Sequence, residues 1–91
     1  MMKRFQYLIS GRGQGVGFRW QTLQATKAIG VTGFVKNLPS GQVLLEAQGE
    51  PEQIAALKQF ILQDMSYARI DSLTEEPREV IPDETIFQIL R

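Results

Sequence analysis

A glycine-rich segment, GRGQGVG at residues 11–17, is followed directly by Phe18 and Arg19. Four of its seven residues are glycine, which suits a loop with positive φ angles or close approach of a ligand to the backbone. Where such a loop enters a helix, backbone N–H groups and the positive end of the helix dipole can surround one anion. Arg19 in the first turn can add a forked, charged hydrogen bond. The pattern therefore favours binding of a phosphoryl or carboxylate group.

The loop lacks the features of the common nucleotide-binding loops. No Gly-Lys-Ser or Gly-Lys-Thr follows it, and its glycines do not have the GxGxxG spacing. On spacing alone, a simpler interpretation stays open, in which a tight turn joins a strand to a helix and Arg19 lies in solvent.

A second candidate is Asn37, which follows a β-rich stretch. A carboxamide both donates and accepts hydrogen bonds without carrying charge, so it is suited to orienting a water molecule. The alternative is that Asn37 caps the turn that begins at Leu38 and Pro39.

Composition excludes several classes of chemistry. The 91-residue chain has no cysteine and no histidine, so disulfides, thiolate nucleophiles and Ser-His-Asp triads are ruled out. Ten basic and ten acidic residues give a formal net charge of zero, without the basic excess of non-specific nucleic-acid binders. No apolar run approaches the roughly 18 residues of a membrane helix, and no signal peptide is evident. We expect a soluble, cytoplasmic, single domain over residues 1–91.

Hydrophobic periodicity in the first half predicts a strand, a helix and a hairpin. Residues 4–10 alternate with period two, as a strand does, with Phe5, Tyr7 and Ile9 on one face. Residues 19–29 carry an apolar stripe at helical spacing, made of the preceding Phe18 with Thr22, Ala25 and Ile29. Gly30 is a suitable helix stop. Residues 31–37 and 42–48 are β-rich and flank a Pro-Ser-Gly turn, which predicts an antiparallel hairpin.

The second half predicts a helix and two further strands. Pro51 with its acidic neighbours favours a helix start, and the stripe ends near Gln63 or Asp64. Residues 67–74 and 85–90 are predicted strands, separated by a predicted loop over 75–83 with two prolines and several acidic residues.

The order β-α-β-β-α-β-β predicts an α+β fold. It is a ferredoxin-like split βαβ sandwich, with an antiparallel sheet of four to five strands and two helices on one face. In such a sheet the first strand-to-helix loop and the end of the next strand meet at one edge. Arg19 and Asn37 can then face one pocket.

Three motifs together resemble the acylphosphatase family. They are GRGQGVGFR at 11–19, GFVKN at 33–37 and LPSGQVLLEAQG at 38–49. The family pattern is approximately G-x-V-Q-G-V-G-F-R, then G-W-V-R-N, then D-G-x-V in the hairpin. The resemblance covers residues 4–90, in the order of elements as well as in the motifs.

The resemblance implies an enzyme that hydrolyses the carboxyl–phosphate bond of acyl phosphates to a carboxylate and inorganic phosphate. Arg19 matches the family's phosphate-binding arginine, and Asn37 matches the asparagine that positions the attacking water. The family's phosphate cradle matches the backbone N–H groups of Gln14, Gly15, Val16, Gly17 and Phe18. The resemblance further implies no metal or other cofactor. We expect a monomer whose partners are small acyl phosphates, inorganic phosphate or similar anions, with no nucleic acid and no membrane.

The departures from the family pattern leave alternatives open. Gly13 stands where the family commonly has Val, which adds backbone freedom inside the expected cradle. Phe34 and Lys36 replace Trp and Arg and keep their chemical class. One alternative is a non-catalytic module that binds anions or phosphate. Another is an RNA-binding domain of similar fold, which zero net charge and the absence of aromatic residues in QVLLEAQ argue against.

Overall fold

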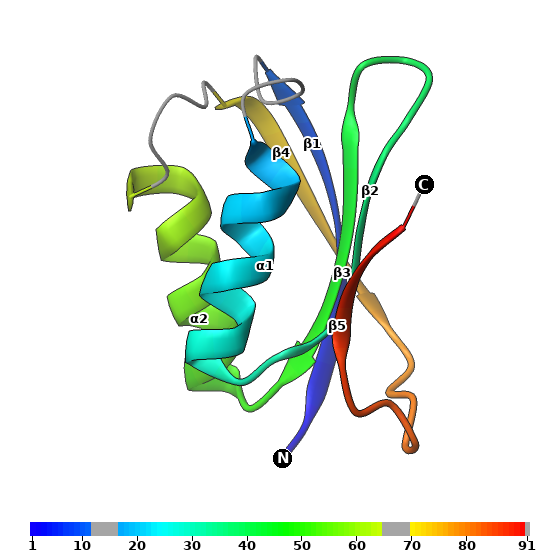
Figure 1. The fold of residues 1–91 in the computed structure, drawn as a ribbon. Helices are drawn as coiled ribbons and strands as arrows, with labels where there is room; N and C mark the ends of the chain where they lie inside the picture. The colour runs from blue at the N-terminus through cyan, green and yellow to red at the C-terminus, as the bar shows by residue number, and fades with distance from the viewer. Residues whose placement is uncertain (12–16, 65–69, 91) are drawn as a thin grey trace.

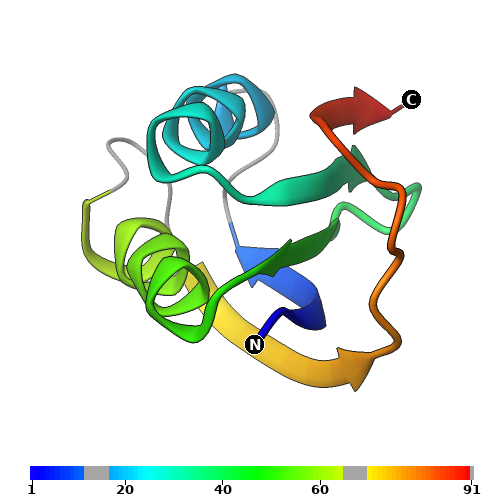
Figure 2. The same ribbon diagram turned by 90° about the horizontal axis from the view of Figure 1, so that it is seen from below.

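A five-stranded sheet with two helices on one face forms the fold (Figures 1 and 2). The computed structural model describes residues 1–11, 17–64 and 70–90. In chain order the elements are β1 (Lys3–Gly11), α1 (Phe18–Ile29), β2 (Thr32–Asn37), β3 (Val43–Gly49), α2 (Pro51–Gln59), η1 (Phe60–Asp64), β4 (Ile70–Arg78) and β5 (Phe87–Leu90). The segment η1 is a π-helical continuation of α2. No helix in these described ranges is long and apolar enough to cross a membrane.

The sheet has the strand order β4-β1-β3-β2-β5. The pairs β1–β3, β1–β4 and β2–β3 are antiparallel, and β5 joins β2 as a parallel edge strand. The predicted ferredoxin-like sandwich and the predicted hairpin are therefore confirmed, and β5 makes the sheet mixed rather than wholly antiparallel.

The core lies between the sheet and the helices. Along β1 the alternation buries Tyr7 and Ile9 on the helix-facing side, as predicted. The helices contribute Ile54 and Leu57 from α2 and a stripe of Phe18, Thr22 and Thr26 from α1. The predicted stripe agrees at Phe18 and Thr22, and Ile29 packs partly buried against the core, but Thr26 rather than Ala25 is the fully buried residue between them. Thr26 takes the buried position because its Oγ1 donates to the Leu23 carbonyl oxygen at 2.9 Å, which satisfies the hydroxyl.

The predicted boundary of the fourth strand is wrong. The predicted loop over 75–83 begins too early, because β4 continues to Arg78, which pairs with Arg4 of β1. Pro77 is tolerated inside it because β4 is an edge strand, so the missing N–H leaves no ladder bond unmade. Residues 67–69 of the prediction lie outside the described residues. At the other end of the chain, β5 begins at Phe87, two residues later than predicted.

A register shift also changes which β4 residues face the core. Ser72 pairs with Ser10 and Ile70 pairs with Gly11, so the pairing passes over Asp71. Ile70 and Leu73 consequently both pack against the core, whereas strict alternation placed them on opposite faces.

The sheet face away from the helices carries a buried polar group, which we call the open-face cluster: Arg4, Glu46, Gln48 and Glu84. Arg4 is 3% exposed, and it donates to Glu46 Oε1 at 2.9 Å and to Glu84 Oε1 at 2.8 Å. Gln48 accepts from the Ile81 N–H at 2.8 Å and donates to the Ile81 carbonyl oxygen at 2.9 Å. These bonds hold the segment between β4 and β5 against the sheet.

Ion pairs between Arg4 and the carboxylates of Glu46 and Glu84 stabilise the open-face cluster. Burial acts to lower the pKa of Arg4, but hydrogen bonds to Glu84 and Glu46 and their negative charges outweigh it and raise that pKa. Arg4 is therefore a fully paired cation with a structural role.

Candidate functional site

The N-terminus of α1 has no capping group of its own. Gly17 occupies the N-cap position at φ +80°, and no side chain of the described residues caps the helix. A Cβ added to Gly17 would approach nothing closer than Gln21 Nε2 at 4.0 Å, so the backbone conformation rather than crowding requires glycine there. The first turn contains no acidic residue. The N–H groups and the positive end of the dipole are therefore not neutralised by the described chain.

Arg19 lies in this first turn and is partly buried. Within the described ranges its guanidinium forms no hydrogen bond and no ion pair. The cation is thus available to a negatively charged ligand.

Asn37 is the last residue of β2, where it pairs with Val43. It follows Gly33 and Val35 on the helix-facing side, and Val35 is 0% exposed. Gly33 permits the close pairing of β2 with β3, because a Cβ there would lie 1.9 Å from the Glu46 carbonyl oxygen. The Oδ1 atom of Asn37 is buried, and it accepts no hydrogen bond from the described residues. Its neighbour Lys36 belongs to the opposite side of the strand, because successive residues of a strand alternate between its two faces.

The topology brings Arg19 and Asn37 to the same end of the molecule. The C-terminal ends of β1 and β2 lie at this end, together with the start of α1 (Figure 1). Of the predicted phosphate cradle, Gly17 and Phe18 are here, and the Phe18 side chain is 1% exposed in the core, so only its backbone N–H can contribute. Gln14, Gly15 and Val16, together with Gly13, lie outside the described residues.

Thr22 is a candidate that the sequence analysis missed. Its position in the apolar stripe of α1 predicts burial, and it is 0% exposed. Its Oγ1, however, has no hydrogen-bond partner in the part of the chain that the structure describes. The sequence feature that could have identified Thr22 is a hydroxyl-bearing residue in an otherwise apolar stripe, three residues after Arg19. We refer to Arg19, Thr22 and Asn37 as the loop-end group.

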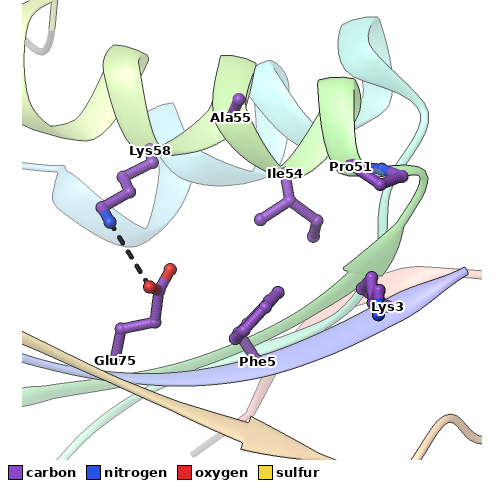
Figure 3. Close-up of a pocket in the computed structure, with 7 residues that line it drawn as sticks. All are labelled: Lys3, Phe5, Pro51, Ile54, Ala55, Lys58 and Glu75. Atoms are coloured by element: carbon purple, nitrogen blue, oxygen red, sulfur yellow. Dashed lines mark hydrogen bonds and ion pairs between the residues drawn. The ribbon is translucent and has the colours of Figure 1, made fainter.

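Two pockets lie away from the loop-end group. One, of about 300 Å³, opens between α2 and β1 and has Phe5 and Ile54 in its lining (Figure 3). At its edge, Lys58 Nζ pairs with Glu75 Oε1 at 3.4 Å (Figure 3). The other, of about 450 Å³, lies beside the end of α1 and the start of β5, near Gly30 and Phe87.

Tyr7 is a core residue whose hydroxyl reaches Glu75, which lines the first pocket. Its hydroxyl donates to Glu75 Oε2 at 2.7 Å. Burial, and then the hydrogen bond to Glu75 and its charge, raise the pKa of the Tyr7 phenol well above its ordinary value. The phenol therefore stays protonated at neutral pH and does not serve as a base. In the described residues no three acidic side chains gather as a metal site would require.

Comparison with known proteins identifies the family. The acylphosphatase family model matches residues 5–89. The acylphosphatase of Methylococcus capsulatus is 37% identical over 90 residues, which cover 99% of this chain and 98% of that protein. That of Clostridium perfringens is 40% identical over 75 residues, 82% of this chain and 84% of the relative. The chain belongs to the acylphosphatase family.

The structure of an acylphosphatase from Coxiella burnetii agrees with this assignment. It superposes with a TM-score of 0.89 at 29% identity, and the match covers 98% of this chain and 93% of that one. Membership of the acylphosphatase family makes the chain an enzyme, a hydrolase of acyl phosphates. The predicted family and activity are confirmed at this level, and the non-catalytic alternative is not favoured.

Proposed function

We propose that this acylphosphatase cleaves the carboxyl–phosphate bond by direct attack of a water on phosphorus. Arg19 and the backbone N–H groups of residues 14–18 hold the phosphoryl oxygens, and Asn37 orients the water. The new O–P bond forms as the P–O bond to the acyl group breaks, and its electron pair leaves on the carboxylate. One proton of the water passes to a phosphoryl oxygen of the substrate.

The observation that carries this proposal is the unused Asn37 Oδ1. A buried acceptor without a partner costs about 1–3 kcal/mol, and the described residues do not offset that cost. A water that donates to Oδ1 satisfies the atom and is itself oriented by it. The acceptor lies at the same end of the molecule as the unpaired Arg19 and the uncapped start of α1.

The chemistry of the leaving group supports a site without imidazole. A carboxylate is weakly basic, with a pKa near 4, so it departs at neutral pH without protonation. Catalysis then requires positioning and stabilisation of phosphoryl charge, for which a guanidinium and backbone N–H groups suffice. The absence of histidine from the sequence is compatible with this mechanism.

The test is hydrolysis of benzoyl phosphate in the presence of a chelator by wild type, Arg19→Ala and Asn37→Ala. We expect Arg19→Ala to lose most phosphate binding and most turnover. Asn37→Ala should bind inorganic phosphate like wild type and lose turnover. Lys36→Ala is the matched control, because Lys36 adjoins Asn37 but faces the opposite side of β2. Normal turnover by Asn37→Ala would contradict the proposal, as would a folded wild type that binds phosphate without turnover.

We also infer that the chain works as a single-domain monomer in the cytoplasm. Its radius of gyration is 11.9 Å, close to the roughly 12 Å expected of one compact domain of this length. The absence of cysteine fits a reducing compartment. Sedimentation equilibrium at micromolar concentration checks the oligomeric state, and a dimer mass would contradict the inference.

A further inference from the structure

Two threonines one turn apart on α1 differ in how their hydroxyls are used. Thr22 and Thr26 are both 0% exposed on the sheet-facing side of the helix. Thr26 Oγ1 donates to the Leu23 carbonyl oxygen at 2.9 Å. Thr22 Oγ1 has no partner among the described residues. Because a helical threonine has two favourable rotamers, one of which reaches the preceding turn, the helix itself does not prevent Thr22 from making that bond.

The position of Thr22 directs its hydroxyl toward the start of α1. Residues three apart share a helix face, so Thr22 lies beside Arg19. Helical side chains lean toward the N-terminus, and Thr22 is only about 6 Å along the axis from Phe18. Thr22 therefore lies near the start of α1, as Arg19 does.

The second unpartnered atom in this region comes from the sheet. α1 packs against β2, and Asn37 Oδ1 is buried at the end of β2 nearest the start of α1. A third unpartnered atom, Thr32 Oγ1, is at the opposite end of β2 and is separate from this pair. Two unpaired polar atoms thus belong to the same end of the helix–sheet layer, one from the helix and one from the sheet.

A single water placed between the two atoms would satisfy both of them. A hydroxyl can donate one hydrogen bond, and a carboxamide oxygen can only accept. Thr22 Oγ1 and Asn37 Oδ1 do not bond to each other, and a water can bridge two such groups. A water that donates to Asn37 Oδ1 and accepts from Thr22 Oγ1 retains one lone pair and one O–H bond. Its orientation is then fixed by two contacts rather than one.

We propose that Thr22 is a second catalytic residue, which holds the attacking water together with Asn37. The free lone pair of the water forms the bond to phosphorus, and the P–O bond to the acyl group breaks with its electrons on the carboxylate. The free O–H bond gives its proton to a phosphoryl oxygen, so the products are a carboxylate and dihydrogen phosphate. This inference rests on the proposed role of Asn37.

The experiment compares Thr22→Val, Thr22→Ser and the control Thr26→Val with benzoyl phosphate as substrate. Valine keeps the shape of threonine and removes the hydroxyl, whereas serine keeps the hydroxyl. We expect Thr22→Val to lower kcat about tenfold or more, as loss of one hydrogen bond to the reacting group does. Its KM and its affinity for inorganic phosphate should stay within about twofold, and its urea midpoint should not fall, because no bond within the described chain is lost.

The control variants separate catalysis from folding. Thr22→Ser should keep most of the turnover. Thr26→Val breaks a hydrogen bond and should unfold at lower urea while keeping normal turnover. A Thr22→Val variant that loses phosphate affinity or stability in step with turnover would make Thr22 structural and overturn the inference.

A double variant tests whether the two residues hold the same water. Thr22→Val added to Asn37→Ala should cost little beyond Asn37→Ala alone, because the water has already lost its orientation. If the reduction in kcat of the double variant equalled the product of the two single reductions, the inference that both residues hold the same water would be wrong. If Asn37→Ala loses turnover while Thr22→Val does not, only the inference about Thr22 fails. If both keep normal turnover, the proposed function fails as well.

Discussion

The open-face cluster and the loop-end group are both polar and partly or fully buried, yet they differ in how many of their hydrogen-bonding groups are used. Arg4 pairs with two carboxylates, and Gln48 makes two bonds to the backbone of Ile81. In the loop-end group, Arg19, Asn37 Oδ1 and Thr22 Oγ1 have no partner in the described residues. The first arrangement holds the β4–β5 segment, and the second leaves capacity for a ligand.

The two helix N-termini differ in the same way. Glu50 and Gln53 form a capping box at the start of α2, with Pro51 and Glu52 in its first turn. The start of α1 has Gly17 instead, with no cap and no acid. A stability argument alone would give both helices a side-chain cap, since such a cap contributes a few tenths of a kcal/mol more than glycine. Polar groups that are paired stabilise this fold, and the unpaired groups lie where we propose that it binds substrate.

The largest difference in stability between the open-face cluster and the loop-end group is expected for their two arginines. Arg4→Met should lower the free energy of unfolding by about 3–5 kcal/mol, because Glu46 and Glu84 lose their buried cation. Arg19→Met should change it by no more than about 0.5 kcal/mol, because no hydrogen bond or ion pair among the described residues is lost. Phosphate affinity should fall strongly in Arg19→Met and stay close to wild type in Arg4→Met. Urea unfolding and phosphate titration check both, and an Arg4 variant as stable as wild type would refute the contrast.

A smaller effect is expected for the two carboxamides. Gln48→Met loses two bonds to Ile81 and should cost about 2 kcal/mol, with faster hydrogen exchange at the Ile81 amide. Asn37→Ala should stay within about 0.5 kcal/mol of wild type while losing turnover. Unfolding curves and amide exchange provide the measurement. Equal stability losses in the two variants would show that Asn37 is a structural residue.

The Tyr7 phenol predicts a dependence of stability on pH. Burial and Glu75 raise its pKa in the folded state above the ordinary value of 10.0. Tyrosine in the unfolded chain ionises near that value, so this contribution is fully present below about pH 10 and is lost as pH rises. The loss is about 1.4 kcal/mol per pH unit. Urea unfolding from pH 8 to 11 should show the fall in wild type and a shallower one in Tyr7→Phe. Identical slopes would mean that the phenol ionises freely.

The smallest effect is expected at the uncapped helix start. Trp20 is 61% exposed in the first turn of α1. Trp20→Glu should stabilise the protein by about 0.3–1 kcal/mol through the helix dipole. It should weaken phosphate binding a few-fold, less so at high salt. Trp20→Gln is the neutral control. Unchanged phosphate affinity in Trp20→Glu would place the anion site away from this helix end.

Local patterns in the sequence determined much of the fold and the candidate site. Hydrophobic periods of two and 3.6 residues identified the strands and helices. These periods are visible in the sequence because the face that a residue occupies depends only on its position along its own strand or helix. Gly30 was predicted to end α1 and does so at φ +99°. The motif match selected Arg19 and Asn37, and their meeting at one end followed from the order of elements. The roles of these two residues stay predictions.

Strand length, register and pairing depend on residues that are distant in sequence, so only the tertiary structure decided them. β4 continues through Pro77 because it is an edge strand, and the register shift at Asp71 changes its faces. The parallel pairing of β5 likewise comes from contacts that no local pattern encodes. Sequence gives the chemical type of a polar residue, but only the assembled fold decides whether it finds a partner. That is why Arg4 became a structural ion pair, whereas Thr22, predicted as core, retains an unused hydroxyl beside Arg19.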